Sequence, residues 1–182
     1  MYRHGARNPL FPYPTDPYSD PSNWPEGWGE LNTIGERQMY ELGLFLRARY
    51  DHILLSEHYS NDEILIQAAN VSRVIKSSEA NLRGIYQYSL DQAKQIPLYI
   101  LPESEDFTTV ALIANCPFYE NEVTKLLSSN EFDGILKDNK DLLDYIALHT
   151  YLPVNSTQFI TALQNSVMLR DTLLVEELSD KV

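Results

Sequence analysis

The sequence predicts an α/β fold in which helices pack on a parallel sheet, followed by a mostly helical region. Residues 64–69 form a short apolar run without alternation, as expected for a strand buried on both faces of a parallel sheet. Residues 96–102 form another apolar run, with prolines near both ends, where a strand tolerates them. From Cys116 onward the apolar residues have helical spacing. We expect a partial α/β core over residues 1–102 and a helical subdomain over residues 103–182.

Length and charge limit the classes of function. The chain has 182 residues, enough for one ordinary core but short for a two-domain enzyme. A net charge of -12 and an isoelectric point near 4.6 argue against nucleic acid or an anionic membrane surface as a partner. The sequence has no apolar run of about 18 residues, so no membrane span is expected, and its first residues lack the pattern of a signal peptide.

Arg3, His4 and Arg7 place three side chains suited to phosphate chemistry within five residues. Each guanidinium presents a planar set of donors that matches phosphate oxygens, and it stays charged at any relevant pH. A neutral imidazole is a nucleophile, and the two neighbouring positive charges are expected to lower the pKa of His4. Gly5 lets the backbone turn tightly against a ligand. The segment therefore predicts a phosphate site in which His4 attacks phosphorus.

Residues 3–9, Arg-His-Gly-Ala-Arg-Asn-Pro, resemble the Arg-His-Gly-x-Arg-x-Pro signature of the histidine acid phosphatases. The resemblance implies that His4 is phosphorylated, that Arg3 and Arg7 bind the phosphate of a small phosphomonoester, and that no metal or other cofactor is needed. In this family an apolar strand runs directly into the signature. Only Met1 and Tyr2 precede it here, so we expect the first strand of the fold to be lacking.

Residues 8–32 are expected to form an ordered surface loop. Six prolines between residues 9 and 25 exclude a helix or a central strand, and aromatic residues give the loop something to pack. The loop serves either as a rim over the active site or as a structural crossover, and the sequence does not choose between the two.

A helix is predicted from Thr33 to about Tyr50. Thr33 and Glu36 have the spacing of a capping box, and apolar residues then recur every three or four positions. Residues 27–50 resemble the segment that follows the nucleophile loop in the animal lysosomal and prostatic members of the family. This helix is expected to be scaffold rather than chemistry.

Arg73 is the third predicted phosphate ligand. It follows the strand at residues 64–69 and precedes a helix expected over about 74–88, and ligands of open α/β sheets bind at the carboxyl ends of strands. Residues 72–84 also resemble the second arginine motif of the family. That motif usually carries an aspartate in the turn before the arginine, where this chain has Asn70 and Ser72, so a local hydrogen bond is expected to differ.

Helical spacing marks three later segments, at residues 120–129, 139–149 and 156–178, with Asn155 or Ser156 as the cap of the last. The resemblance implies a mostly helical subdomain that is inserted in an α/β sandwich and covers the phosphate pocket. It also implies a lysosomal or secreted protein.

Several single residues complete the prediction. His52, His58 and His149 form no metal-ligand spacing, so no metal site is expected. Asn155 lies in an Asn-Ser-Thr glycosylation pattern. The resemblance implies a disulfide between Cys116 and a later cysteine, which this sequence lacks, so the partner of Cys116 stays open.

Two hypotheses of function follow from one departure. Family members carry a His-Asp or His-Glu pair that supplies the general acid, and no such dipeptide follows Arg73. The chain is therefore either the amino-terminal part of an acid phosphatase or a truncated, catalytically impaired member that acts as a phosphate-binding or interaction module. Phytate and lysophosphatidate are alternative substrates, and a homodimer of the full-length protein is left open.

Overall fold

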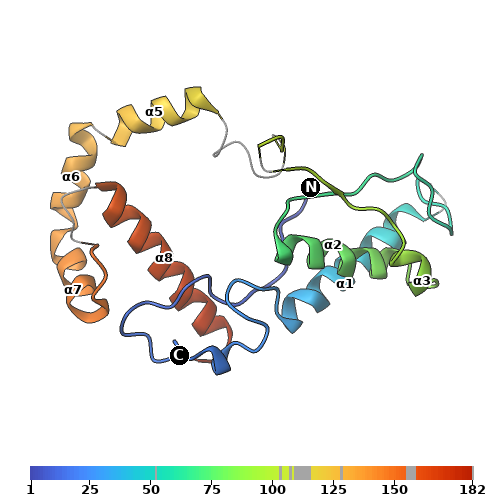
Figure 1. Cartoon of the computed structure of the whole chain (residues 1–182), viewed down its shortest axis with the longest axis horizontal. Coiled ribbons are helices and arrows are strands. Elements are labelled where there is room, and N and C mark those ends of the chain that lie inside the picture. The colour runs from blue at the N-terminus through green and yellow to red at the C-terminus, as the bar shows by residue number, and fades with distance from the viewer. Residues whose placement is uncertain are drawn as a thin grey trace. The chain divides into compact units, whose positions relative to one another are not determined.

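The computed structural model describes residues 1–51, 53–102, 104–106, 108, 116–127, 129–154 and 159–181 (Figure 1). Contacts group the chain into two compact units: unit 1 comprises Met1–Arg7 and Glu30–Asn115, and unit 2 comprises Asn8–Gly29 and Cys116–Val182. The loop after Arg7 thus belongs with the later helices. The domain boundary near residue 103 stays a prediction, because compact units need not be separate domains.

Unit 1 contains the helices α1 (Thr33–Tyr50), α2 (Ser72–Ile85) and α3 (Leu90–Ala93), and the strands β1 (Gln67–Ala68) and β2 (Tyr99–Ile100). The two strands pair in parallel, with Gln67 opposite Tyr99 and Ala68 opposite Ile100. This mixture of helices with a small parallel sheet confirms the α/β class in its coarse form.

Helices α1 and α2 lie side by side and approach to backbone contact (Figure 1). A Cβ on Gly43 would lie 2.1 Å from the Asn81 carbonyl oxygen, and one on Gly84 would lie 2.2 Å from that of Tyr40. Asn81 Nδ2 also donates to the Met39 carbonyl at 3.1 Å. A cluster of buried residues lies nearby and forms the core of unit 1: Leu55, Leu82, Ile85, Tyr86, Ala93 and Ile96.

Helix α1 spans the predicted residues, but its predicted cap is wrong. The cap is Asn32, whose Oδ1 accepts a hydrogen bond from the Gly35 amide at 2.9 Å. Thr33 is already the first helical residue. Asn is at least as good a cap as Thr, so the two neighbouring candidates cannot be separated by residue type alone.

The first strand is shorter and less buried than predicted. Strand β1 covers only Gln67–Ala68. Ala68 and Ala69 are buried, whereas Leu65 is 66% exposed and Gln67 is also exposed, so burial on both faces is wrong for this segment. Helix α2 begins at Ser72 and ends at Ile85, slightly earlier at both ends than predicted.

Unit 2 contains the short helix η1 (Pro21–Asn23) and the helices α5 (Pro117–Leu127), α6 (Asn130–Asp138), α7 (Lys140–Thr150) and α8 (Phe159–Leu178). Three of these confirm predicted helices, whereas α6 was not predicted, since Gly134 near its centre weakens a helical pattern. The predicted cap at Asn155 or Ser156 lies outside the described residues. Among the described helices, none is long and apolar enough to cross a membrane.

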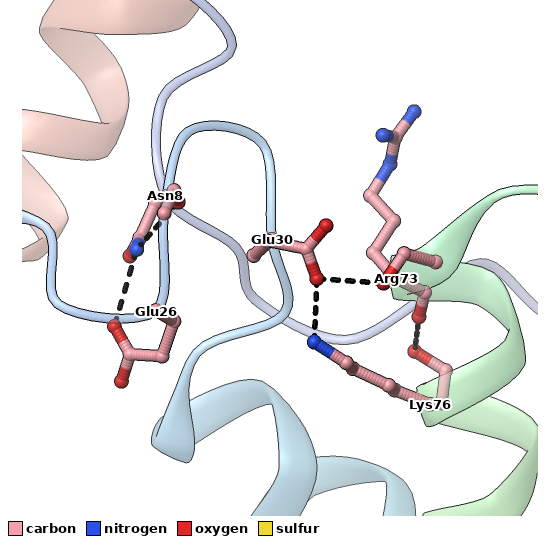
Figure 2. A network of polar contacts seen from close by, with 8 residues as sticks. Asn8, Glu26, Glu30, Arg73 and Lys76 are labelled. Carbon is pink, nitrogen blue, oxygen red and sulfur yellow. Dashed lines mark hydrogen bonds and ion pairs between the residues drawn. The ribbon is translucent and has the colours of Figure 1, made fainter.

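Within the predicted loop at residues 8–32, residues 8–29 are joined by polar contacts of their own, which were not predicted. The Gly29 amide donates to the Pro9 carbonyl at 2.7 Å. Asn8 Nδ2 donates to Glu26 Oε2 at 3.1 Å and to the Gly27 carbonyl at 3.0 Å (Figure 2). Gly27 and Gly29 have φ angles of 102° and 69°, which favour glycine, so these two positions shape the return of the loop.

Candidate active site

The Arg-His-Gly loop, residues 3–7, lies directly against the first turn of α1. The Asn32 amide donates to the Ala6 carbonyl at 3.1 Å, and Arg7 forms an isolated bridge with Leu31. A Cβ on Gly5 would lie 2.3 Å from the Gly35 carbonyl oxygen, and one on Gly35 would lie 2.0 Å from the Ala6 carbonyl oxygen. Two glycines are therefore required for this backbone-to-backbone contact.

Two side chains from different helices bind the amides of the loop. The Gly5 amide donates to Ser77 Oγ of α2 at 3.2 Å. The Ala6 amide donates to Gln38 Oε1 of α1 at 2.9 Å. The backbone around His4 is thus bonded to both α1 and α2.

The imidazole of His4 is half-buried and oriented by its own backbone. Its Nδ1 lies 2.8 Å from the Gly5 carbonyl oxygen. A carbonyl oxygen only accepts hydrogen bonds, so we assign the proton of the neutral ring to Nδ1. This assignment leaves a lone pair on Nε2, the ring nitrogen that is not bonded to the Gly5 carbonyl.

The pKa of His4 is lowered from its ordinary value. Burial is the largest cause, and the positive charges of Arg73, Arg3 and Arg7 add to it, whereas the bond to the Gly5 carbonyl acts in the opposite direction. The direction was predicted from the sequence, but burial as its main cause was not. The structure thus brings the three predicted arginines close enough for their charges to act on His4.

The three arginines have different surroundings. Arg3 is exposed, Arg7 is 8% exposed, and Arg73 is half-buried at the second residue of α2. Beside Arg73, Glu30 Oε2 accepts hydrogen bonds from Ser72 Oγ at 2.7 Å and from Lys76 Nζ at 2.6 Å (Figure 2). These two bonds lower the pKa of Glu30. The Arg73 side chain extends away from this ion pair (Figure 2).

A cavity of about 420 Å³ borders the loop. Tyr2, Arg3 and His4 line one part of it, and much of the remainder is apolar, with Ile66 and Ala69 among its walls. Apolar walls give a phosphate dianion no partners. Phosphate affinity is therefore expected to come from the arginines rather than from the cavity walls.

The other single residues named from the sequence have surroundings of their own or lie outside the described residues. Among the described residues, no group of three or more His, Cys, Asp or Glu side chains could bind a metal ion. His58 is exposed, and His149 packs against Tyr145 in α7. Cys116 is half-exposed and forms no disulfide with a described residue. His52 and Asn155 lie outside the described residues.

A family model with the description histidine phosphatase superfamily (branch 2) matches residues 1–162. The match contains Arg3, His4, Arg7 and Arg73. The chain belongs to the histidine phosphatase superfamily, branch 2. The family resemblance seen in the sequence is thereby confirmed.

Relatives of this branch 2 chain carry the names of acid phosphatases. It is 36% identical over 159 residues to lysosomal acid phosphatase of Xenopus laevis. The aligned region covers 84% of this chain and 36% of the relative. It is 32% identical over 154 residues to prostatic acid phosphatase of Bos taurus, covering 80% of this chain and 39% of the relative. Prostatic acid phosphatase of Homo sapiens is 33% identical over 150 residues, 79% of this chain and 38% of the relative. The chain thus spans well under half the length of these relatives.

The two residues whose side chains bond the Arg-His-Gly loop were not predicted from the sequence. Ser77 and Gln38 are polar residues in helices, a common and uninformative pattern, so only their place in the resembling segments could have indicated them. Gly35 gave a stronger signal, since a glycine in the first turn of a helix is costly unless close packing requires it.

Proposed function

We propose that this chain carries the nucleophile and phosphate-binding half of an acid phosphatase active site. The observation that carries the proposal is the surroundings of His4. Its Nδ1 is bonded to the Gly5 carbonyl, and the charges of Arg3, Arg7 and Arg73 all act on its ring. The acid phosphatase names of the relatives support the same reaction.

The reaction has two steps. Nε2 of His4 attacks phosphorus, the P–N bond forms, and the bond between phosphorus and the alcohol oxygen breaks. The leaving oxygen takes a proton from a general acid, which is not identified among the residues of this chain. Water then attacks phosphorus, the P–N bond breaks, orthophosphate leaves, and the water proton restores the acid.

The arginines replace a metal in this scheme. Arg3, Arg7 and Arg73 neutralise charge on the three equatorial oxygens of the transferring phosphoryl group, the role that a cation plays in other phosphoryl transfers. The proposal therefore requires no cofactor. The lowered pKa of His4 keeps more of the imidazole neutral in mildly acidic surroundings, where an acid phosphatase works.

Substrate and setting follow the relatives and the charge of the chain. We infer a small phosphomonoester as substrate, with phytate or lysophosphatidate as alternatives, and a lysosomal or secreted protein. The net charge of -12 disfavours nucleic acid. We further propose that residues 103–182 form a helical subdomain inserted in the fold whose core is at residues 1–102, and that a full-length protein would form a homodimer.

The test is hydrolysis of p-nitrophenyl phosphate at acidic pH by the 182-residue chain. This aryl ester is chosen because its leaving group needs little protonation, whereas loss of a general acid typically costs roughly 10² to 10⁴ in rate. We expect His4→Ala to lower turnover at least about 100-fold. Tartrate is expected to inhibit the wild-type chain.

His58→Ala is the matched control, since His58 is an exposed histidine of the same unit. Its turnover should equal that of the wild type. Turnover that survives His4→Ala would contradict the proposal. Phosphate binding that depends on Arg73 without any turnover would favour the impaired, phosphate-binding member instead.

A further inference from the structure

Ser77 links the two parts of the candidate site through one hydroxyl. Its Oγ accepts a hydrogen bond from the Gly5 amide at 3.2 Å and donates its own proton to the Arg73 carbonyl at 2.6 Å. Ser77 is 1% exposed, so water does not compete for either bond. The hydroxyl thus uses its proton on one side and a lone pair on the other.

The two bonded groups belong to the two sides of the proposed phosphate site. The Gly5 amide is part of the peptide that joins His4 to Gly5, and the Arg73 carbonyl lies one helical turn before Ser77 in α2. A shift of the loop relative to α2 would therefore change the separation between His4 and Arg73. Among the hydrogen bonds of the described residues, this one joins the His4–Gly5 peptide to α2 directly.

We propose that Ser77 is a positioning residue that sets His4 relative to Arg73 for attack on phosphorus. It acts through the Gly5 amide and the Arg73 carbonyl and does not touch the substrate. The proposal rests on the proposed function of His4.

The expected effect falls on kcat rather than on KM. The His4 ring has two torsions, and Nδ1 is bonded to the loop backbone, so a displaced loop displaces Nε2 directly. Arginine side chains are long and can follow the phosphate by rotation. Misplacement of a reacting group by a fraction of an ångström to one ångström costs roughly tenfold to 100-fold in rate. Ser77→Ala should thus lower kcat about tenfold or more, with KM changed less than about twofold.

Ser78 provides a matched control. It is the adjacent residue of α2, is 4% exposed, and its Oγ donates to the Val74 carbonyl at 3.1 Å, the same one-turn pattern that Ser77 shows. Its hydroxyl faces Tyr2 rather than the Gly5 amide. Ser78→Ala removes the same atoms from the same helix and leaves the loop amide bonded, so kcat should change less than about twofold.

The experiment compares the 182-residue wild type with Ser77→Ala and Ser78→Ala. Steady-state kinetics with p-nitrophenyl phosphate gives kcat and KM, and amide hydrogen exchange of Gly5, read by NMR, gives the integrity of the contact. We expect Gly5 exchange to be at least about tenfold faster in Ser77→Ala and unchanged in Ser78→Ala. Circular dichroism checks that both variants are folded.

The two possible failures are separable. Turnover that survives His4→Ala overturns the function proposed above, and Gly5 exchange then decides on its own whether Ser77 orients the loop. Turnover that depends on His4 but is equal in the two serine variants overturns the positioning role. Equal Gly5 exchange in the two variants overturns the contact itself.

Discussion

Residues 3–7 and residues 8–29 follow one another in the chain, yet their surroundings stabilise them in two different ways. In unit 1 the Arg-His-Gly loop is bonded by uncharged partners, the Ser77 hydroxyl and the Gln38 amide, and packs backbone to backbone on Gly35. In unit 2 the loop at residues 8–29 places Asp16 against Glu176 of α8, two buried acids. The partners of the first loop have no proton to gain or lose near neutral pH, whereas the acid pair of the second has one.

The Asp16–Glu176 pair requires a shared proton. Asp16 is 5% exposed and Glu176 is 0% exposed. Asp16 Oδ1 accepts from the Tyr18 amide at 2.6 Å, but neither Glu176 oxygen nor Asp16 Oδ2 receives an N–H or O–H donor from a described residue. Burial first, and then the charge and hydrogen bond of Asp16, raise the pKa of Glu176 to about 7.

This difference gives the two loops different responses to pH. The lowered pKa of His4 keeps its ring neutral down to a more acidic pH, and the raised pKa of Glu176 makes the loop at residues 8–29 more stable at acidic pH. The contacts of the Arg-His-Gly loop itself are expected to be the same at pH 5 and at pH 7. Three substitutions test the contrast.

Gly35→Ala should cause the largest loss of stability, because it disrupts the packing of the Arg-His-Gly loop on α1 in unit 1. The new Cβ would lie 2.0 Å from the Ala6 carbonyl oxygen and 2.5 Å from the Ala6 nitrogen, and a backbone group cannot move aside cheaply. We expect a loss of about 3 kcal/mol or more in the free energy of unfolding, together with loss of turnover. Chemical denaturation followed by far-UV circular dichroism measures the change.

Gly134→Ala is its control. A Cβ on Gly134 would meet nothing within 4 Å, and the residue lies inside α6. Alanine is the better helix former, so this variant should gain up to about 1 kcal/mol. If both glycine variants behaved alike, close packing of the Arg-His-Gly loop on α1 would be contradicted.

Glu176→Gln tests the acid pair of unit 2. The pKa of Glu176 rises from 4.5 to about 7 on folding, so its stabilising proton is fully present below about pH 4.5 and is lost as the pH rises through 7. At about 1.4 kcal/mol for each pKa unit, the linkage is worth about 3 kcal/mol. Between pH 4.5 and pH 7.5, the wild type should therefore lose about 3 kcal/mol more than Glu176→Gln.

The measurement is denaturant unfolding followed by tryptophan emission. Both tryptophans of the chain, Trp24 and Trp28, lie in the loop at residues 8–29, so their emission reports unit 2. Tyr13 also faces the acid pair, but burial raises its pKa further above this range. Glu177→Gln, at the exposed neighbouring residue, should retain the wild-type pH dependence. An equal pH dependence in all three proteins would refute the shared proton.

The sequence indicated the candidate residues of the site but not the contacts that support them. Arg3, His4 and Arg7 were predicted from three suitable side chains within five residues and Arg73 from its place after a strand, each with support from the family resemblance. The structure brings the charges of the arginines to act on the His4 ring. Ser77 and Glu176 were not predicted, because their roles come from contacts with residues 72 and 160 positions away along the chain. A serine or a glutamate in a helix is unremarkable until its neighbours are known.

Secondary structure shows the same limit. The helix at Thr33–Tyr50 was predicted from a long periodic pattern, whereas β1 was overestimated because a short apolar run does not reveal how many strands pair with it. Helix α6 was missed since Gly134 interrupts its pattern. In short segments, tertiary contacts rather than local sequence patterns decide the secondary structure.

Asn32→Ala should cause the smallest loss of stability of the three, and it tests which residue caps α1 in unit 1. Its side chain caps α1 through the Gly35 amide at 2.9 Å, while its backbone amide, which the substitution keeps, bonds the Ala6 carbonyl. We expect a loss of about 1 kcal/mol, and less than about 0.5 kcal/mol for Thr33→Ala, measured by the same denaturation. A larger loss of stability in Thr33→Ala than in Asn32→Ala would instead indicate that Thr33 is the cap. The Gly35 amide donates to the Asn32 side chain, and Gly35 also packs on the Arg-His-Gly loop. If the turnover of folded Asn32→Ala falls although most of the protein stays folded, the cap also orients the loop.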